Sequence, residues 1–564
     1  MEKIMTKRVN IDSYSGEKYK FLKKIYMIFT CTVIFVSVCF TVAINFSDIK
    51  IWYNRVFPPE SISVLNLTSE QKKEDFNYLC NVLENGMPVL SVLESECDLD
   101  YYALKTDYEK RIENTVSDIE FYCMLNSFLN TIPSAHTFLC TPSYSNYEAL
   151  NCNNSYNMLA VRGLKQYSDY WNEEVSTALS TAAYGDVYCA TYSSHDGSYY
   201  FNNGDKIISV NGISVDEYII ETPMIYSLCF DGINQKLYRS NIFFSSENAG
   251  GEKVKLMIDS GEDVIETNLY GGGYNDYSIV LSDMNNSDNS SENTDLLSVT
   301  NEYSFNTDDS NQLLYADISV LNYDNAEYIK SMLENRKYNT VILDLRNNPG
   351  GNPQLFFNSI YTPLVKDDMT ADFKWYTPET KINKKNVFFY NPLYGAYVRI
   401  RDGVKYAETD SLPDMGSKYV ENNYSYLCTG NQVKDADIYL LISSRTASAA
   451  DKLTAVLSKK AKVFITGDST AGEGMGNSPA ADILPNSHLI FIYYPSIAYN
   501  IDGSNNSIHG TSPDRFIYEY NIEHLSIMKE LFRNGQDPYT YENRLKWDNV
   551  LIETLEIIKE KEAA

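Results

Sequence analysis

The sequence at residues 438–459 reads IYLLISSRTASAADKLTAVLSK, and it decides the fold of the region around it. Its first five residues form an apolar run rich in β-branched and aromatic side chains, which is typical of a buried strand. The segment from Lys452 to Lys459 has the composition and apolar spacing of a helix. A buried strand that turns directly into a helix indicates an α/β domain.

Ser448 lies in the turn between this strand and this helix. A hydroxyl at such a turn projects above the sheet edge, and the N–H groups of the first helical turn point toward the same space. A serine there can attack a carbonyl carbon while the N–H groups hold the resulting oxyanion. Serine is also a common helix N-cap. The position therefore has a nucleophilic interpretation and a capping one.

A second stretch, at residues 341–351, reads VILDLRNNPGG, which is typical of a buried strand that runs into a Pro-Gly-Gly turn. Adjacent glycines let a backbone N–H approach a ligand closely and adopt angles that other residues avoid. Another apolar run begins at Leu313, and a helical pattern follows between Asn325 and Arg336. This strand–helix–strand order favours parallel pairing with a right-handed crossover.

Together the two stretches resemble the serine peptidases of the C-terminal-processing (tail-specific) and tricorn-core family, which have an Asp-Leu-Arg-x-Asn-x-Gly-Gly segment upstream of the nucleophile. The downstream family pattern follows in order, as TGDSTAG at 466–472, LP at 484–485, DG at 502–503 and GTSPD at 510–514. The resemblance implies a ClpP/crotonase-like α/β core, hydrolysis of peptide bonds, a polypeptide substrate and Ser448 as the nucleophile.

The resemblance also indicates the general base. Tail-specific members use a Ser-Lys dyad, but Glu473 stands where the lysine is expected, and a carboxylate cannot replace a deprotonated amine. In the tricorn-like branch, a histidine follows a helix in an Asp-Gly-His-Thr turn, and residues 134–137 read SAHT here. Among the five histidines of the chain, His136 is therefore expected to be the base, with His509 in reserve. A histidine after a helix is also a common surface or capping residue.

The acidic member of the site is less directly indicated. The position that carries an acid in the tricorn-like pattern is Ser507, and Asp502 is the nearest carboxylate. We expect Asp502 to orient the histidine, or else to serve only as a turn residue. The resemblance implies that the backbone N–H groups of Gly351 and Ala449 form the oxyanion hole, with Gly350 beside them.

Four charged residues near these motifs are expected to have structural roles. Asp344 and Arg346 should brace a strand end, Asp514 should be structural, and Lys452 should lie on a solvated helix face.

The N-terminal region predicts a membrane anchor. Residues 25–44 carry no charged side chain, and a helix of that length spans roughly 30 Å. Lys and Arg outnumber Asp and Glu before it, which places residues 1–24 in the cytoplasm and the chain after the anchor outside. A cleaved signal peptide is the alternative, although the apolar stretch is longer than a typical signal and no small-x-small cleavage site follows closely.

The rest of the chain divides by pattern into five parts. After the anchor at 25–45, we expect a tether at 46–66 and a helical N-terminal subdomain at 67–150. A PDZ-like β-rich domain is expected at 155–275, because residues 203–212 read NGDKIISVNG and resemble a PDZ core motif; a plain β-hairpin is the alternative. A flexible polar linker at 276–312 then leads to the catalytic α/β domain at 313–564.

Composition limits the possible partners. The formal net charge of −28 argues against nucleic acid, which requires basic surfaces. No Cys/His cluster has the spacing of a zinc site, and we expect no metal and no cofactor. Of the ten cysteines, those between 80 and 229 are candidates for disulfides outside the cytoplasm, with no pairing indicated.

These observations predict a membrane-anchored, extracytoplasmic serine endopeptidase that acts through an acyl-enzyme on Ser448. A catalytically inactive ligand- or peptide-binding protein on the same fold is the alternative, since the expected acid is missing and the histidine turn is altered. A scaffold led by the PDZ-like domain is a third interpretation.

Overall fold

The computed structural model describes residues 66–116, 118–139, 303–308, 312–334, 338–384, 404–407, 412–433, 435–476, 479–519 and 536–563, a few residues between 520 and 535, and strand segments between 179 and 269. The expected cytoplasmic tail, anchor and most of the tether lie outside this part of the chain. Within it, no helix is both long and apolar enough to cross a membrane.

A six-stranded sheet forms the centre of the α/β domain, in the order β11-β12-β13-β16-β17-β20. Strands β12 to β20 run parallel, and β11 pairs antiparallel with β12. The strands expected around residues 313, 341 and 438 are all present. The six strands are β11 (Tyr303–Asp308), β12 (Leu313–Ile318), β13 (Thr340–Asp344), β16 (Asp437–Ile442), β17 (Val463–Gly467) and β20 (Arg515–Phe516).

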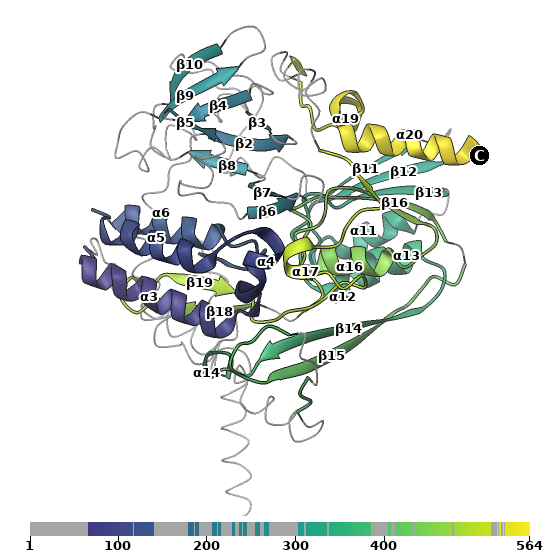
Figure 1. Ribbon diagram of the computed structural model, residues 1–564. Coiled ribbons are helices and arrows are strands. Elements are labelled where there is room, and N and C mark those ends of the chain that lie inside the picture. The colour runs from purple at the N-terminus through teal and green to yellow at the C-terminus, as the bar shows by residue number, and fades with distance from the viewer. Residues whose placement is uncertain are drawn as a thin grey trace, which may run out of the picture.

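Helices cover both faces of this sheet (Figure 1). One face carries α11 (Ala326–Leu333), α12 (Pro353–Phe356), the π-helical turn η5 (Phe357–Tyr361), α13 (Thr362–Leu364) and α16 (Ala449–Leu457). The other face carries α19 (Tyr541–Trp547) and α20 (Asn549–Ala563).

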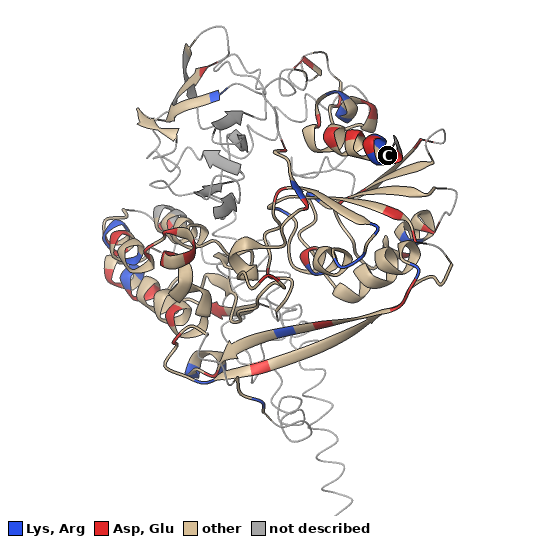
Figure 2. Ribbon diagram, turned by 45° about the vertical axis from the view of Figure 1, so that its right-hand side comes forward, with Lys and Arg blue, Asp and Glu red and all other residues tan. Residues whose placement is uncertain are grey.

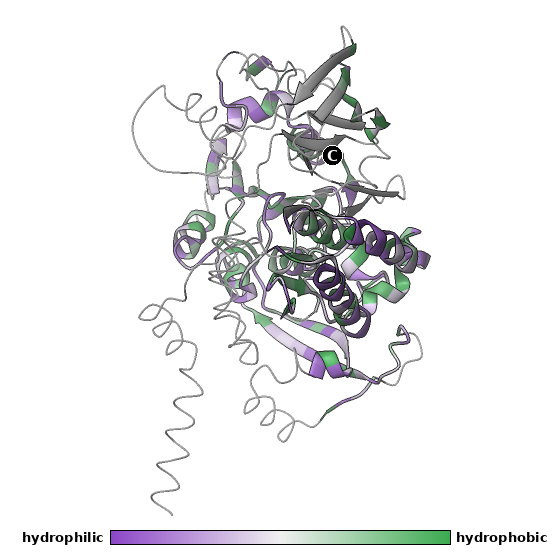
Figure 3. Cartoon of the chain, turned by 90° about the vertical axis from the view of Figure 1, so that its left-hand side faces the viewer, coloured by the Kyte–Doolittle hydropathy of each residue, from purple (hydrophilic) through white to green (hydrophobic). Residues whose placement is uncertain are grey.

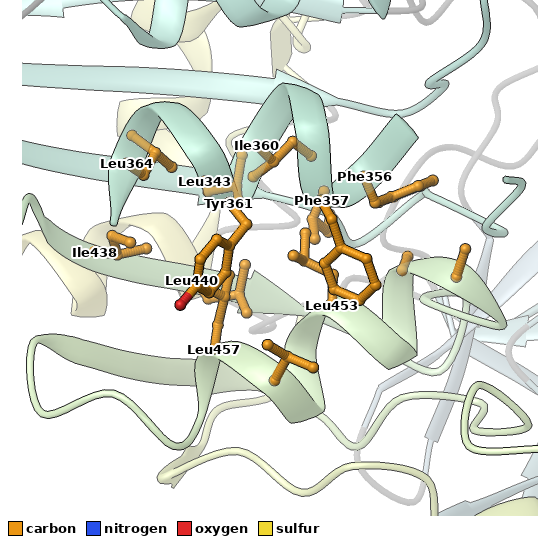
Figure 4. Close-up of a cluster of buried hydrophobic side chains, with 14 of the residues drawn as sticks. Leu343, Phe356, Phe357, Ile360, Tyr361, Leu364, Ile438, Leu440, Leu453 and Leu457 are labelled. Carbon is orange, nitrogen blue, oxygen red and sulfur yellow. The ribbon is translucent and has the colours of Figure 1, made fainter. Parts of the chain in front are cut away.

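The side chains of β13 alternate between these two layers, as a strand requires. Leu343 packs in the core on the α16 side, where Figure 4 shows it near Tyr361 and Leu440. Ile342 instead packs against Leu551 of α20. Because both faces of the strand are buried, its three central residues, 341–343, are all apolar, which explains the short apolar run in the sequence.

Two predictions about this domain were wrong in detail. The linker expected at 276–312 contains a strand, β11, whose partly buried Tyr303 and Phe305 pack against the core; residues 276–302 lie outside the described part. The sequence pattern from Asn543 to Lys561 predicts one amphipathic helix, but the helix is broken at Asp548, which ends α19 and accepts a hydrogen bond from the Leu551 N–H at the start of α20.

A buried cluster of charges fixes this break to the sheet. Arg346 donates to both carboxylate oxygens of Asp344 and, through Nη1 and Nη2, to Asp548 at 2.8 and 2.6 Å. Arg544 adds bonds to Asp317 and Asp548. Burial opposes ionisation of Asp344, but the adjacent Arg346 lowers its pKa to about 2. Asp344 and Arg346 therefore brace the strand end, as expected.

The helical subdomain consists mainly of α3 (Ser69–Gly86), α5 (Tyr101–Glu113) and α6 (Asp118–Asn130), close to the three helices expected there. Thr68 and Gln71 form a capping box at the start of α3. Phe76, Tyr108 and Phe128 pack together between the helices. Figure 3 shows more hydrophilic residues on the outer faces of these helices.

A small sheet joins this subdomain to the α/β domain. Its order is β1-β19-β18, with β1 (Phe138–Leu139), β18 (Ala480–Ile483) and β19 (Ile490–Tyr493). The first strand belongs to the helical subdomain, and the other two follow β17 of the central sheet. The two parts therefore share one core, since Leu129 and Phe491 belong to the same buried cluster.

Two further β structures flank this core. A long hairpin pairs β14 (Met369–Pro378) with β15 (Tyr419–Cys428), and it lies below the α/β domain in Figure 1. Between 179 and 269, strands form an antiparallel sheet of order β10-β9-β4-β3-β2-β8, with β5 paired to β4. Its strands are β2 (Leu179–Tyr184), β3 (Val187–Ala190), β4 (Lys206–Val210), β5 (Ile213–Ser214), β8 (Asn241–Phe244), β9 (Val254–Asp259) and β10 (Val264–Leu269), and β6 (Leu228–Asp231) pairs with β7 (Lys236–Arg239). The PDZ-like character of this region stays a prediction.

Figure 2 shows Lys and Arg interspersed with Asp and Glu along the described helices and strands. Cys80, Cys97 and Cys428 are free thiols in that part. No group of three or more His, Cys, Asp or Glu in it has the arrangement of a metal site.

Candidate active site

Ser448 occupies the N-cap position of α16 but does not act as a capping side chain. Its backbone has φ +54° and ψ −118°, and its side chain makes no cap hydrogen bond. A positive φ at a residue other than glycine costs of order 1–3 kcal/mol, and such strain is found most often at functional sites. The capping interpretation of the serine is therefore wrong, and its half-buried hydroxyl is left for another use.

Neighbouring segments hold this strained turn in place. The Ser448 N–H donates to Gly472 O at 3.0 Å, and the Ala447 N–H donates to Asn348 O at 3.1 Å. Thr446 donates its hydroxyl to Leu345 O at 2.8 Å. The serine turn is thus bonded on one side to the Gly-Gly loop and on the other to the segment after β17.

The Gly-Gly loop lies directly against the serine. Gly350 has φ +101°, and a Cβ built on it would come within 2.7 Å of Ser448 Cβ and 2.8 Å of Ala449 N. Only glycine fits at such a contact. Its own N–H donates to Asn348 Oδ1 at 2.9 Å, so the structure does not offer Gly350 as an oxyanion donor. Its role is to let the two turns touch.

Gly351 and Ala449 remain as candidate donors. Ala449 is the first residue of α16, where backbone N–H groups have no partner within the helix. Gly351 has φ +145°. Within the described residues, neither N–H makes a hydrogen bond. Both belong to segments that contact Ser448, and this arrangement suits an oxyanion hole.

His136 lies in the turn between α6 and β1 and is bonded to Glu473. Its ring Nδ1 is 2.7 Å from Glu473 Oε2, and its backbone N–H donates to the same oxygen at 2.7 Å. The ring stacks on Tyr494, which follows β19, with centroids 5.7 Å apart. With Nδ1 bonded to the carboxylate, Nε2 is the nitrogen left to exchange a proton with a substrate or nucleophile.

Glu473 is fully buried and accepts hydrogen bonds at both carboxylate oxygens. Ser134 donates its hydroxyl to Glu473 Oε1 at 2.6 Å. The residue has φ +59° and follows Gly472, which has φ +74°. Since Gly472 O accepts the Ser448 N–H, the histidine's acidic partner is one residue away from a direct backbone contact with the candidate nucleophile.

The structure does not place Asp502 at His136. Asp502 is exposed, and its Oδ1 accepts from the N–H and the hydroxyl of Ser504 at 2.9 and 2.7 Å. It is a turn residue, which was the alternative to its catalytic role. The reserve base His509 pairs with Glu96 at 2.9 Å.

Sequence reasoning missed Glu473 as the acid, although a signal was present. Glu473 stands where relatives with a Ser-Lys dyad carry lysine, so the position already belongs beside the nucleophile. A carboxylate there cannot act as the lysine does, and it is the carboxylate that lies 2.7 Å from His136 Nδ1. Ser134, whose difference from the Asp-Gly-His-Thr turn seemed a weakness of the match, donates to that acid.

Lys452 also differs from expectation. It is 7% exposed, and its ammonium group lies 4.4 Å from the ring centroid of Phe373 and 5.4 Å from that of Tyr426. Burial lowers the pKa of Lys452 to about 8, although Asp451 acts in the opposite direction. The residue faces the β14–β15 hairpin and not solvent. Asp514 is structural, as expected, and accepts from the Ile465 N–H at 2.8 Å.

The fold and these residues define a candidate serine hydrolase with a Ser, His and Glu constellation. Residues 313–516, which include both the Gly-Gly loop and Ser448, match the family model described as Peptidase family S41. Over that range the chain is therefore similar to the serine-type peptidases of family S41.

Solved structures of related architecture are distant in sequence. Mature CPAF complexed with lactacystin is 13% identical, with 83% of this chain and 99% of that chain covered and a TM-score of 0.46. The photosystem II D1 C-terminal processing protease is 14% identical, with 80% and 93% covered and a TM-score of 0.35. The tricorn protease is 11% identical, with 82% and 36% covered and a TM-score of 0.23. No curated protein matches the chain.

Proposed function

We propose that the chain is a serine endopeptidase in which Ser448 is the nucleophile, His136 the general base and Glu473 the acid that orients it. One observation carries this proposal. The strained serine makes no cap hydrogen bond, and its backbone N–H donates to Gly472, the residue before the carboxylate that binds His136 Nδ1.

The geometry supports a two-step reaction. In the first step, His136 Nε2 takes the Ser448 proton as Oγ attacks the scissile carbonyl, and Glu473 stabilises the imidazolium that forms. The N–H groups of Gly351 and Ala449 bind the oxyanion. The histidine then gives its proton to the leaving amine, which breaks the C–N bond and leaves an ester on Ser448.

In the second step, water attacks this ester and gives its proton to His136. Collapse of the intermediate returns the proton to Ser448 Oγ and releases the new carboxyl terminus. The starting enzyme is thereby restored, and no cofactor takes part in either step.

Glu473 also bears on the non-catalytic alternative. That interpretation rested on a missing acid and an altered histidine turn. A buried carboxylate at 2.7 Å from the ring supplies the acid, and the altered turn supplies Ser134 to hold it. The structure therefore favours the enzyme over a binding protein or a scaffold.

Labelling with a fluorophosphonate tests the mechanism without a known substrate. We expect the full-length protein to be labelled at Ser448, with the site located by mass spectrometry, and Ser448→Ala to abolish labelling. His136→Ala should slow it strongly. Folded protein that is not labelled would contradict the enzyme mechanism and favour the binding protein.

We also propose that the catalytic part is extracytoplasmic and tethered by residues 25–45. The support is the sequence alone, namely the uncharged apolar stretch preceded by an excess of Lys and Arg. Protease accessibility of intact and permeabilised cells tests the orientation. Degradation of the catalytic part only after permeabilisation would contradict it.

A further inference from the structure

Asp451 is a buried carboxylate that the proposed reaction does not use. It lies in the first turn of α16, three residues after Ser448, and its exposed fraction is 0%. An isolated buried carboxylate is costly, so its partners show what holds it there.

Four donors from three separate segments bind this carboxylate. Oδ1 accepts from the hydroxyls of Thr470 and Thr511, at 2.5 and 2.6 Å. Oδ2 accepts from the Gly474 N–H at 3.1 Å and from Asn506 Nδ2 at 3.2 Å. One side chain of the nucleophile helix thus joins the segments around 470–474, 506 and 511.

One of these bonds ends directly beside the acid of the proposed triad. Gly474 follows Glu473, and a Cβ built on Gly474 would lie 2.6 Å from Asp451 Oδ2 and 2.3 Å from Ser448 O. On the other side, Gly472 O accepts the Ser448 N–H. Glu473 is therefore held between two glycines that both contact the serine turn or its helix.

The contacts of these two glycines matter because the backbone conformation of Glu473 is unfavourable. Its φ is +59°, a conformation that persists only where surrounding contacts enforce it. The Gly474 bond to Asp451 is one of those contacts. Without it, the peptide after Glu473 can rotate and move the carboxylate away from His136.

We propose that Asp451 is a positioning residue, which fixes Glu473 relative to Ser448 by binding the N–H of Gly474. The inference rests on the proposed triad and deepens it. Asp451 does not touch substrate; it acts through Glu473 and His136.

The variant Asp451→Asn tests this with little risk to the fold. The Thr511 hydroxyl can rotate and accept from an amide NH₂, whereas the Gly474 N–H can only donate. An asparagine therefore has the same size but a weaker, neutral acceptor for Gly474. Its thermal midpoint and circular dichroism should remain close to those of the wild type.

We expect Asp451→Asn to lower the maximal rate constant of fluorophosphonate labelling by about tenfold or more, with little change in the concentration that gives half that rate. That pattern separates positioning from a loss of binding. In a Glu473→Gln background, Asp451→Asn should cause little further loss, because residues that act as a unit are not additive.

Asp514→Asn is the matched control, because Asp514 is another carboxylate of this domain that accepts a backbone N–H, that of Ile465. If Asp514→Asn lowers the labelling rate at all, its fold-change should multiply with that of Glu473→Gln in the double variant. The inference is overturned if folded Asp451→Asn reacts like the wild type, or if its loss multiplies fully with that of Glu473→Gln. If the wild-type protein is not labelled at Ser448, both the triad and this inference are overturned. If the wild type is labelled and Glu473→Gln slows the labelling, the triad stands, and the behaviour of Asp451→Asn decides this inference alone.

Discussion

At the scale of single residues, the site was only partly predictable. Ser448 and His136 lie in motifs that can be recognised by local sequence, and the structure places each of them in a turn. The acid could not be assigned in the same way, because a carboxylate's partner depends on which distant loop folds against it. Asp502 was the nearest acid to the family position, yet a turn of its own binds it to Ser504.

Glu473→Gln should lower the labelling rate of Ser448 by about 10²- to 10⁴-fold, since an amide can hold His136 in the wrong tautomer and does not stabilise the imidazolium. Asp502→Asn should have no effect, because that exposed residue does not contact the histidine. Rates of labelling measured on both purified variants decide between the two acids. Equal losses in both variants, or a loss in Asp502→Asn alone, would contradict the assignment of Glu473.

Lys452→Met should raise the free energy of unfolding at neutral pH by about 1–2 kcal/mol. Burial lowers the pKa of this lysine to about 8, from the ordinary value of 10.5, so holding its charge inside destabilises the fold. Contacts with two aromatic rings offset part of this cost. The penalty is complete below pH 8 and disappears as the pH rises toward 10.5, so the advantage of methionine should shrink over that interval.

Urea unfolding of Lys452→Met at several pH values measures this effect. Lys459→Met, at an exposed position on the same segment, is the control and should change stability little at any pH. A Lys452→Met protein that is less stable than the wild type at pH 7 would show that the ring contacts outweigh the burial of the charge.

At the scale of elements, the central strands were predictable because each is buried on both faces and reads as an apolar run. The strand β11 was not, because none of its residues is fully buried and its neighbours are polar. The division between α19 and α20 was also missed. It depends on Asp548 binding Arg346, which is 202 residues away in the sequence, and no local pattern records such a partner.

Arg346→Met should therefore destabilise the α/β domain by about 3–5 kcal/mol, because it leaves Asp344 and Asp548 buried with fewer partners. Asp344 has a pKa of about 2 in the fold, against an ordinary 3.8. The stability that ionised Asp344 adds to the fold is complete above pH 3.8 and is lost as the pH falls through about 2. The deficit of Arg346→Met should accordingly narrow in acid.

Denaturant unfolding between pH 2 and pH 7 tests this prediction. Arg515→Met removes an exposed cation whose carboxylate partner is 3.9 Å away, and it should cost less than about 1 kcal/mol. Similar losses in the two variants would mean that the buried charge cluster contributes no more than a surface ion pair.

At the scale of the whole molecule, the candidate site is assembled from two parts of the chain. His136 belongs to the helical subdomain, whereas Ser448 and Glu473 belong to the α/β domain. The connection runs through β18 and β19, which leave the α/β domain and pair with β1 next to the histidine. Sequence motifs place the serine and the histidine in separate regions, but only the structure shows that a shared sheet and core bring those regions together.

Asp75 of α3 is one of the side chains that bind this connection. Asp75 is fully buried, and it accepts from the backbone N–H groups of Asn486 and Ser487, both at 2.8 Å, in the turn between β18 and β19. Asp75→Ala leaves both N–H groups without this acceptor, and we expect a cost of about 2–4 kcal/mol. Because β19 leads into Tyr494, which stacks on His136, melting of this junction should also disable the site.

The expected result is that labelling of Ser448 and helical circular dichroism are lost at the same temperature, and that Asp75→Ala lowers both midpoints together. Asp107→Ala, which removes an exposed carboxylate paired with Arg111 on α5, should move neither by more than a degree or two. Labelling that survives after the helices have melted would mean that Ser448 is activated without His136. The α/β domain would then have to contain its own base, so this experiment tests whether the two parts form one catalytic unit.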